Sequence, residues 1–211
     1  MSATKPVRPG VAGVDIPLRC RCGYVRGVAC GVSPSAGFRF ICYCKDCQAF
    51  ARFLERPDVL DPAAGTDIFQ MPPGRIKLTA GLDALRCLRL SSKGVLRWYT
   101  GCCRTPIGNT AGPRFPVIGV VHSFMDHEGD GRSRDVVLGP PLCRIFGRSS
   151  VGPLPSSGPR PPSLGLFVSR ASKLFRWWLR GLARPTPFFD DGAKAPRADP
   201  RVLTQSERAA L

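Results

Sequence analysis

The stretch Cys42-Tyr-Cys44-Lys-Asp-Cys47 places three thiols within six consecutive residues. In C-x-C and C-x-x-C turns two sulfurs can converge on one ion, and thiolates favour zinc, Cu(I) or iron–sulfur clusters over magnesium or calcium. The spacing differs from the usual iron–sulfur motifs, which argues against such a cluster. Cysteines packed as small apolar residues are the alternative. Three thiols this close together favour a metal site.

Cysteines on either side of this stretch extend the pattern. Cys20-Arg-Cys22-Gly precedes it, and the adjacent Cys102 and Cys103 follow it. Nine of the ten cysteines lie between residues 20 and 103, which places the functional core there. A cytoplasmic chain keeps its thiols reduced, so metal explains this concentration better than disulfides. We therefore predict one or two zinc ions, with ligands drawn from Cys20, Cys22, Cys42, Cys44, Cys47, Cys102 and Cys103.

The isolated cysteines and the two histidines are given no metal role. Cys30, Cys87 and Cys143 each stand alone in the sequence, and we expect them to pack as small apolar residues. His122 falls in a predicted strand, and we interpret it as a side chain on a partly solvent-exposed face of the sheet. His127 falls in a predicted turn.

Short apolar segments separated by Gly- and Pro-containing turns predict a mainly β fold. Each segment is four to six residues long and rich in β-branched or aromatic residues, which favours strands over helices. A helix of one or two turns is expected at 48–54, directly after the densest cysteine group. The predicted strands are 38–41, 76–79, 85–90, 95–99 and 116–121.

The composition divides the chain into five parts. A stretch rich in Pro, Gly and Ser forms a predicted linker, and an amphipathic basic helix follows it. The expected parts are a flexible N-terminal segment 1–15, a zinc-binding β domain 16–146, the linker 147–165, the helix 166–184 and a polar tail 185–211.

The predicted 166–184 helix has an apolar and a basic face, and Pro185 is expected to end it. The apolar face carries Phe167, Ala171, Leu174, Phe175, Trp178 and Leu182, and the basic face carries Arg170, Lys173, Arg180 and Arg184. We expect the apolar face to pack on the β domain, as most amphipathic helices do. Peripheral contact with a membrane interface, through Trp177 and Trp178, is the alternative.

Composition excludes several classes of protein. The 211 residues include 23 Gly and 22 Pro, too many for a helical bundle, and no G-X-Y period indicates collagen. A hydrophobic content of 43% argues against a fully disordered chain. No secretory signal or transmembrane segment is recognisable, so we expect a cytoplasmic protein. The net charge of +16 divides evenly, with +8 in residues 1–139 and +8 in 140–211, so nucleic-acid binding is not favoured.

The order of the cysteine motifs resembles the glutathione-dependent formaldehyde-activating enzyme family, whose domain also occurs in centromere protein V. The family pattern is C-x-C-G, then C-H-C-x-x-C-R, then F-C-x-x-C-G-[ST]-x-[LI], followed by a closing strand. The resemblance covers about residues 16–126, roughly half of the chain, and rests on 20–23, 42–48, 99–107 and 117–126.

The chain departs from that pattern at several positions. Tyr43 stands where the family has His, and Gln48 where it has Arg. Thr100 stands where the first distal cysteine is expected, and Arg104 where a glycine is expected. Cys102 is available as a substitute, but neighbouring side chains diverge, which makes adjacent cysteines awkward ligands for one ion. The metal site that the family builds from its first and third cysteine motifs is therefore expected to be rearranged, weakened or lost in this chain.

The resemblance implies a zinc-stabilised Mss4-like, or β-tent, fold of short antiparallel strands. It implies a structural zinc held by Cys20, Cys22, Cys103 and one more ligand. It also implies a catalytic zinc held by Cys42, Cys44 and Cys47, with a coordination position left for a thiol or water.

The family's reaction joins formaldehyde to glutathione, so the resemblance implies a carbon–sulfur lyase acting on a thiol–aldehyde adduct, with glutathione as one candidate thiol. A non-enzymatic, zinc-stabilised binding module with a basic surface is the alternative.

Overall fold

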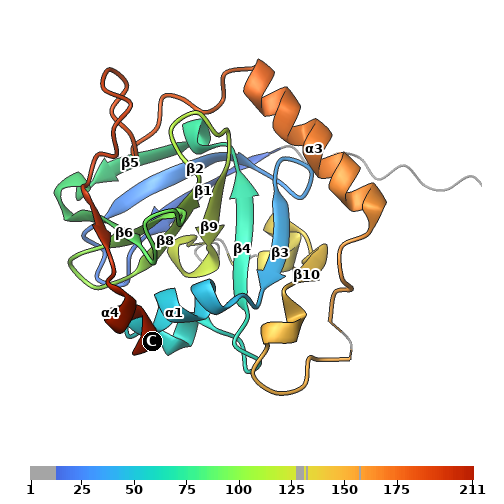
Figure 1. The fold of residues 1–211 in the computed structure, drawn as a ribbon. Coiled ribbons are helices and arrows are strands. Elements are labelled where there is room, and N and C mark those ends of the chain that lie inside the picture. Colours follow the sequence, from blue (N-terminus) through green and yellow to red (C-terminus); the bar gives the residue numbers. More distant parts are fainter. Residues whose placement is uncertain (1–12, 127–130, 132, 157) are drawn as a thin grey trace, which may run out of the picture.

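Short strands in two sheets form the framework of this computed structural model, which describes residues 13–126, 131, 133–156 and 158–211 (Figure 1). His127 and most of the predicted N-terminal segment 1–15 lie outside the described residues. The smaller sheet has the order β1 (Val14–Arg19), β2 (Arg26–Val32), β5 (Ile76–Ala80). The larger sheet has the order β10 (Cys143–Ile145), β3 (Phe38–Cys42), β4 (Thr66–Met71), β9 (Ile118–Val121), β8 (Pro106–Thr110), β7 (Leu96–Thr100), β6 (Leu85–Arg89), β11 (Pro200–Val202).

All five predicted strand segments form strands, namely β3, β5, β6, β7 and β9. The mainly β class is therefore confirmed. Pairing is antiparallel except at the two edges of the larger sheet, where β10 runs parallel to β3 and β11 runs parallel to β6. β10 and β11 are each separated from their partner strand by a long stretch of chain. Such a connection permits parallel pairing, whereas strands joined by a tight hairpin must run antiparallel.

The two sheets share one apolar core. Ile16 and Leu18 of β1 pack in the same cluster as Phe69 of β4 and Trp98 of β7. Burial of these side chains supplies most of the free energy that holds the sheets together.

The C-terminal segment differs from the polar tail expected for residues 185–211. Phe188 and Phe189 are fully buried, and their rings lie 5.2 and 5.7 Å from the Trp98 ring. Beyond them the chain adds β11 to the larger sheet and ends beside α1 (Figure 1). Two adjacent aromatic residues in a polar segment account for the difference, because they gain more from the core than the segment loses in conformational entropy.

The helices lie outside the sheets (Figure 1). Short 3-10 turns cover Pro57–Val59, Pro73–Arg75, Leu82–Ala84, His122–Phe124 and Gly147–Ser149. The helix expected at 48–54 begins three residues earlier, because the Cys44 side chain caps it by accepting the backbone N–H of Cys47. The helices are α1 (Lys45–Phe53), α2 (Arg134–Leu138), α3 (Leu164–Leu179) and α4 (Gln205–Ala209).

Helix α3 ends at Leu179 rather than at the predicted Pro185. Gly181 has a φ of +63° and donates to the carbonyl of Trp178, while Leu182 donates to that of Trp177. This pair of bonds is a Schellman motif, which glycine favours because it adopts a positive φ without steric cost.

The expected docking face of α3 is also wrong. The helix packs on the domain through Leu166, Arg170, Lys173, Leu174 and Trp177. Phe167, Phe175 and Trp178, which were expected to be buried, are 54%, 58% and 60% exposed. Lys173, expected on the basic face, instead points to the domain, and its ammonium donates to the carbonyls of Ser35 and Gly37 at 2.9 and 2.8 Å. None of the described helices is both long and apolar enough to cross a bilayer.

Candidate metal centres

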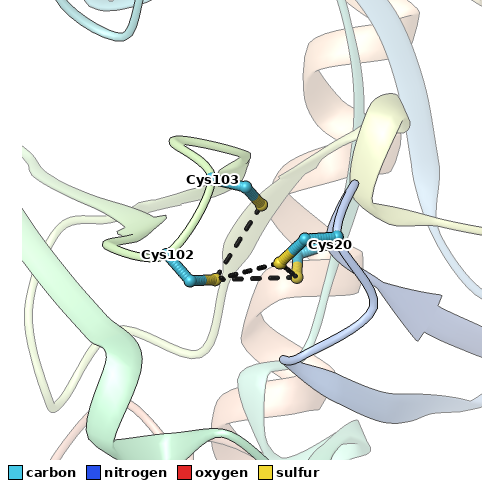
Figure 2. Close-up of side chains that lie close together, drawn as sticks. Cys20, Cys102 and Cys103 are labelled. Carbon is cyan, nitrogen blue, oxygen red and sulfur yellow. Dashed lines mark hydrogen bonds between the residues drawn. The ribbon is translucent and has the colours of Figure 1, made fainter.

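Four thiols from two distant turns meet between the sheets. The sulfurs of Cys20, Cys22, Cys102 and Cys103 all lie within 4.8 Å of one another. Cys22 and Cys102 are the closest pair across the gap, at 3.4 Å. Figure 2 shows Cys102 and Cys103 pointing from their loop toward Cys20 on the facing loop. One ion bound here would cross-link the β1–β2 turn of the smaller sheet to the β7–β8 turn of the larger one.

The first of these turns follows directly from its sequence. Cys20 comes immediately after β1, and its sulfur accepts the backbone N–H of Val25 at 3.2 Å. Gly23 donates to the Cys20 carbonyl and has a φ of +76°, a conformation that most other residues adopt only with strain. The C-x-C-G motif is therefore a tight turn that presents two sulfurs on the same side.

The second turn brings two adjacent cysteines together. The divergence expected of neighbouring side chains belongs to extended chains, whereas residues 101–103 form a turn. The sulfurs of Cys102 and Cys103 lie 3.9 Å apart. The backbone N–H of Thr100 donates to the Thr105 carbonyl and that of Arg104 to the Thr100 carbonyl, and Arg104 has a φ of +54°. Cys102, and not Thr100, therefore supplies the fourth sulfur of this group.

Thr100 retains a role beside this group. Its hydroxyl lies 3.4 Å from the Cys103 sulfur, and the Thr105 hydroxyl lies 3.2 Å from the same sulfur. Burial opposes ionisation of this thiol, but these hydroxyls lower the pKa of Cys103 to about 5. Both threonines therefore favour the thiolate form that binds metal.

The second group of thiols forms at the junction of β3 and α1. Cys42 ends β3, Cys44 caps α1 and Cys47 lies in its first turn, and their three sulfurs lie within 4.8 Å of one another. Cys42 and Cys47 are buried, and Cys44 is half-buried. Thiol donors Cys42 and Cys47 lower the pKa of Cys44, and the helix N-terminus adds positive potential.

A buried arginine lies beside this group. Arg97 of β7 is 4% exposed, and its Nη1 lies 3.9 Å from the Cys47 sulfur. The guanidinium also stacks over the Phe50 ring at 5.4 Å and lies 3.7 Å from Asp46. A divalent cation with three thiolates carries one net negative charge, which one buried arginine offsets. Sequence reasoning missed Arg97, although an arginine between Leu96 and Trp98 is the signal that could have found it.

In the described part of the chain no fourth Cys, His, Asp or Glu joins the three-thiol group. A cavity of about 10 Å³ lies next to it, bordered by Cys47, Arg97, Thr66, Asn109 and apolar side chains. The Thr66 hydroxyl is buried and has no hydrogen-bond partner among the described residues. This space is about that of one water molecule.

Tyr43 and Gln48, which flank Cys44 and Cys47, have structural contacts. The Tyr43 hydroxyl donates to Asp61 at 2.9 Å. The Gln48 amide donates to the carbonyls of Tyr43 and Ser149, which ties α1 to the segment after β10.

The isolated cysteines join neither group in the described chain. Cys87 and Cys143 pack in apolar clusters, as expected, and burial raises the pKa of Cys87 to about 12. Cys30 is half-buried.

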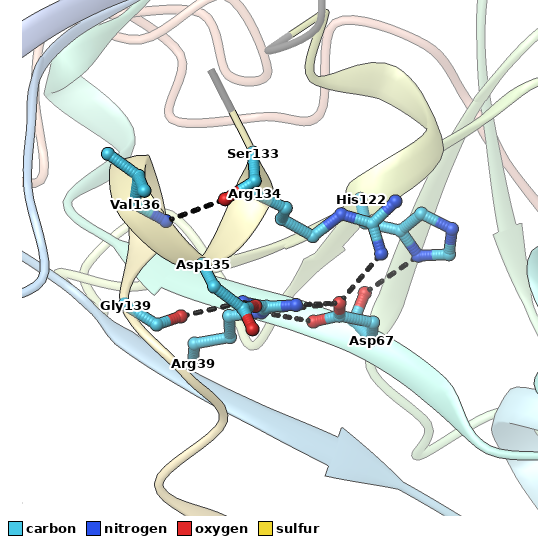
Figure 3. A network of polar contacts seen from close by, with 8 residues as sticks. All are labelled: Arg39, Asp67, His122, Ser133, Arg134, Asp135, Val136 and Gly139. Atoms are coloured by element: carbon cyan, nitrogen blue, oxygen red, sulfur yellow. Dashed lines mark hydrogen bonds and ion pairs between the residues drawn. The ribbon is translucent and has the colours of Figure 1, made fainter.

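His122 lies next to a buried ion-pair network (Figure 3). Its Nδ1 is 3.3 Å from the Asp67 carbonyl oxygen. Asp67 accepts two bonds from the Arg39 Nε, at 3.0 and 3.2 Å, and one from its Nη2 at 2.7 Å, and it also pairs with Arg134 at 3.0 Å. The other side of Arg39 donates to Asp135 and to the Gly139 carbonyl, each at 2.6 Å. This network joins β3 and β4 to α2.

Comparison with known proteins gives a family without an assigned activity. The family described as "Family of unknown function (DUF6151)" matches residues 12–199. The chain belongs to this family. The matched range includes both thiol groups and α3, so the family domain extends well beyond the motif-bearing part of the sequence. No curated protein matches the chain.

Proposed function

We propose that the protein binds two zinc ions, one structural and one at a reaction centre, and acts as a carbon–sulfur lyase on a thiol–aldehyde adduct. The observation that carries this proposal is the contrast between the two groups. Cys20, Cys22, Cys102 and Cys103 offer four sulfurs, enough to close a tetrahedral site. The three-thiol group offers three sulfurs, and no fourth Cys, His, Asp or Glu joins it in the described chain. Three protein ligands with one open position are typical of catalytic zinc.

Zinc at the three-thiol group would supply Lewis acidity toward a carbonyl or thiolate. Side chains around the three-thiol group would set the charge, hydrogen bonding and solvent access of the open coordination position. Arg97 offsets the charge of the thiolates. The Thr66 hydroxyl, which has no partner among the described residues, offers a hydrogen bond at the edge of the cavity. Apolar neighbours such as Phe50 exclude bulk water.

The substrate class follows from the resemblance of the cysteine motifs to formaldehyde-activating enzymes, and a zinc-stabilised Mss4-like fold is proposed on the same ground. The cavity of about 10 Å³ admits a water-sized group. A thiol as large as glutathione does not fit this cavity, so its binding requires the residues that line it to move apart.

A second candidate is a non-enzymatic, zinc-stabilised module that binds an acidic partner. The small cavity beside Cys47 favours it, and so does the surface beside the four-thiol group. There a cleft of about 280 Å³ is bordered by Arg21, Arg56 and Arg104, with Glu55 as the acidic residue. Arg104 pairs with Glu55 and Arg56 with Asp58, each at 2.6 Å, so a ligand with negative charge would meet mainly Arg21 or would displace one of these carboxylates.

Metal content and turnover together test the proposal. Wild type should contain two zinc ions per chain and Cys44→Ser one, and a glutathione-plus-formaldehyde assay should show turnover that Cys44→Ser loses. Cys87→Ser is the control, because this buried cysteine belongs to neither group. Turnover that survives in Cys44→Ser would exclude the three-thiol group as the reaction centre. Two zinc ions with no turnover by wild type would favour the binding module.

A further inference from the structure

The outward side of α3 carries large apolar side chains. Five of them form what we call the outer face, and their exposed fractions lie between 54% and 62%. They are Phe167, Val168, Phe175, Trp178 and Leu179. At 100° per residue these positions fall within one continuous arc of about 120°, which borders the packed side at Leu174 and otherwise turns away from the domain. The rings of Phe175 and Trp178 stack at 6.1 Å with an interplanar angle of 22°, so part of the face is ordered without a partner.

Contacts on the inner side hold the helix in this orientation. Trp177 is buried, and the Lys173 ammonium donates to two backbone carbonyls in the β2–β3 connection. The Arg170 guanidinium lies over the Phe38 ring at 5.4 Å. Rolling the helix to bury the outer face would break all of these contacts. The fold therefore presents the outer face rather than leaving it exposed by poor packing.

Positive charge borders the outer face. Arg176 and Arg180 lie on the flank next to Leu179, and neither forms an ion pair with any described residue. Residues 140–211 contain 12 basic and 4 acidic residues, and the whole chain has a net charge of +16. Apolar side chains flanked by arginines match the boundary between acyl chains and anionic headgroups. A second copy of this chain fits less well, because like charges repel across such an interface.

We propose that the outer face of α3 docks the protein on an anionic lipid surface. Phe175 and Trp178 enter the boundary between headgroups and acyl chains, while Arg176 and Arg180 contact lipid phosphates. The helix lies along the surface, with the β domain held on the aqueous side by Lys173 and Trp177. Both thiol groups stay with the domain, so this docking is independent of the reaction proposed above.

Tryptophan fluorescence gives a selective readout. The chain has three tryptophans, and Trp98 and Trp177 are already buried while Trp178 is 60% exposed. Vesicles containing phosphatidylglycerol should therefore shift the emission to shorter wavelength through Trp178. Trp178→Phe should still sediment with these vesicles but lose the spectral shift.

Vesicle sedimentation of the full chain tests the proposal, with Trp178→Asp against Ser169→Asp. Both variants change the charge equally on exposed positions of α3, but Ser169 lies on the arginine flank and not on the outer face. Ser169→Asp therefore measures the effect of the added negative charge alone. Trp178→Asp should lower partitioning into phosphatidylglycerol vesicles by at least about tenfold, and Ser169→Asp by less, because it keeps the apolar contact. Unchanged near-ultraviolet circular dichroism and thermal midpoint establish that both variants fold. Added salt should weaken binding, and phosphatidylcholine vesicles should bind less.

Three results would overturn the proposal. One is wild type that stays in the supernatant with anionic vesicles, and another is an equal loss of binding in the two variants. The third is a dimer in sedimentation equilibrium that Trp178→Asp converts to monomer, which would assign the outer face to a second copy of the chain.

Discussion

Asp67 and Arg39 form a buried ion pair. Replacing Asp67 with asparagine removes the negative charge but keeps the shape of the side chain. The Asp67 side chain is 10% exposed and that of Arg39 is 5% exposed, so neither charge is well solvated in the folded protein. Removing one partner of a buried pair costs about 3–5 kcal/mol, because the other charge remains buried. Arg39 keeps its bonds to Asp135 and the Gly139 carbonyl, which places the expected loss near the lower end, at about 3 kcal/mol. For a chain of this size the thermal midpoint should fall by about 6–12 °C.

Urea unfolding of Asp67→Asn and Asp135→Asn at fixed zinc concentration measures this loss. Asp135 is the matched control, because it bonds to the same arginine but its side chain is 66% exposed. An exposed partner contributes about 1 kcal/mol or less. Equal losses in the two variants would refute the reasoning, because burial would then not decide the cost.

The same pair predicts a pH dependence. Burial alone would raise the pKa of Asp67, but hydrogen bonds and charge from Arg39, with His122 and Arg134, hold it below its usual value. A carboxyl with a lowered pKa stabilises the fold above its unfolded pKa, and this contribution disappears as the pH falls through the folded pKa. The difference in unfolding free energy between wild type and Asp67→Asn should therefore be full at neutral pH and shrink below pH ~4. A difference that grows in acid would contradict the assignment.

The remaining predictions concern α3, the three-thiol group, the smaller sheet and the metal. Lys173→Met removes two bonds from an ammonium to carbonyls and should cost about 1–3 kcal/mol in urea unfolding. Arg97→Met should weaken zinc binding by about 10–100-fold in competition with a chromogenic chelator, while unchanged affinity would remove Arg97 from the metal centre. Gly27→Ala places a Cβ 2.2 Å from the Lys77 carbonyl oxygen and should cost about 1–3 kcal/mol, whereas a neutral result would mean that β2 and β5 separate freely. A strong chelator should lower the thermal midpoint, and zinc should restore it, because structural zinc stabilises the fold that binds it.

Local chemistry accounts for the features that could be predicted. The β-branched and aromatic segments became strands because such side chains pack well on a sheet, and in β7 every side chain except the half-buried Tyr99 is buried. The three-thiol group could be identified because its ligands lie within six residues, where a strand end and a helix cap suffice to bring them together.

Other features depend on contacts between distant segments. Cys102 joins Cys22 across 80 residues only because the two sheets face each other, and a turn lets it lie beside Cys103. Arg97 reaches Cys47 only because the fold brings β7 beside α1.

The sequence by itself determined the fold class, the identity of the seven clustered thiols and the amphipathic character of α3, because these follow from residue type and spacing. Tertiary structure alone decided that Cys102 joins Cys20, Cys22 and Cys103, and which side of α3 faces outward. The reason is energetic. In the observed orientation the Lys173 ammonium donates to two backbone carbonyls and Trp177 is buried, while Phe175 and Trp178 stay exposed.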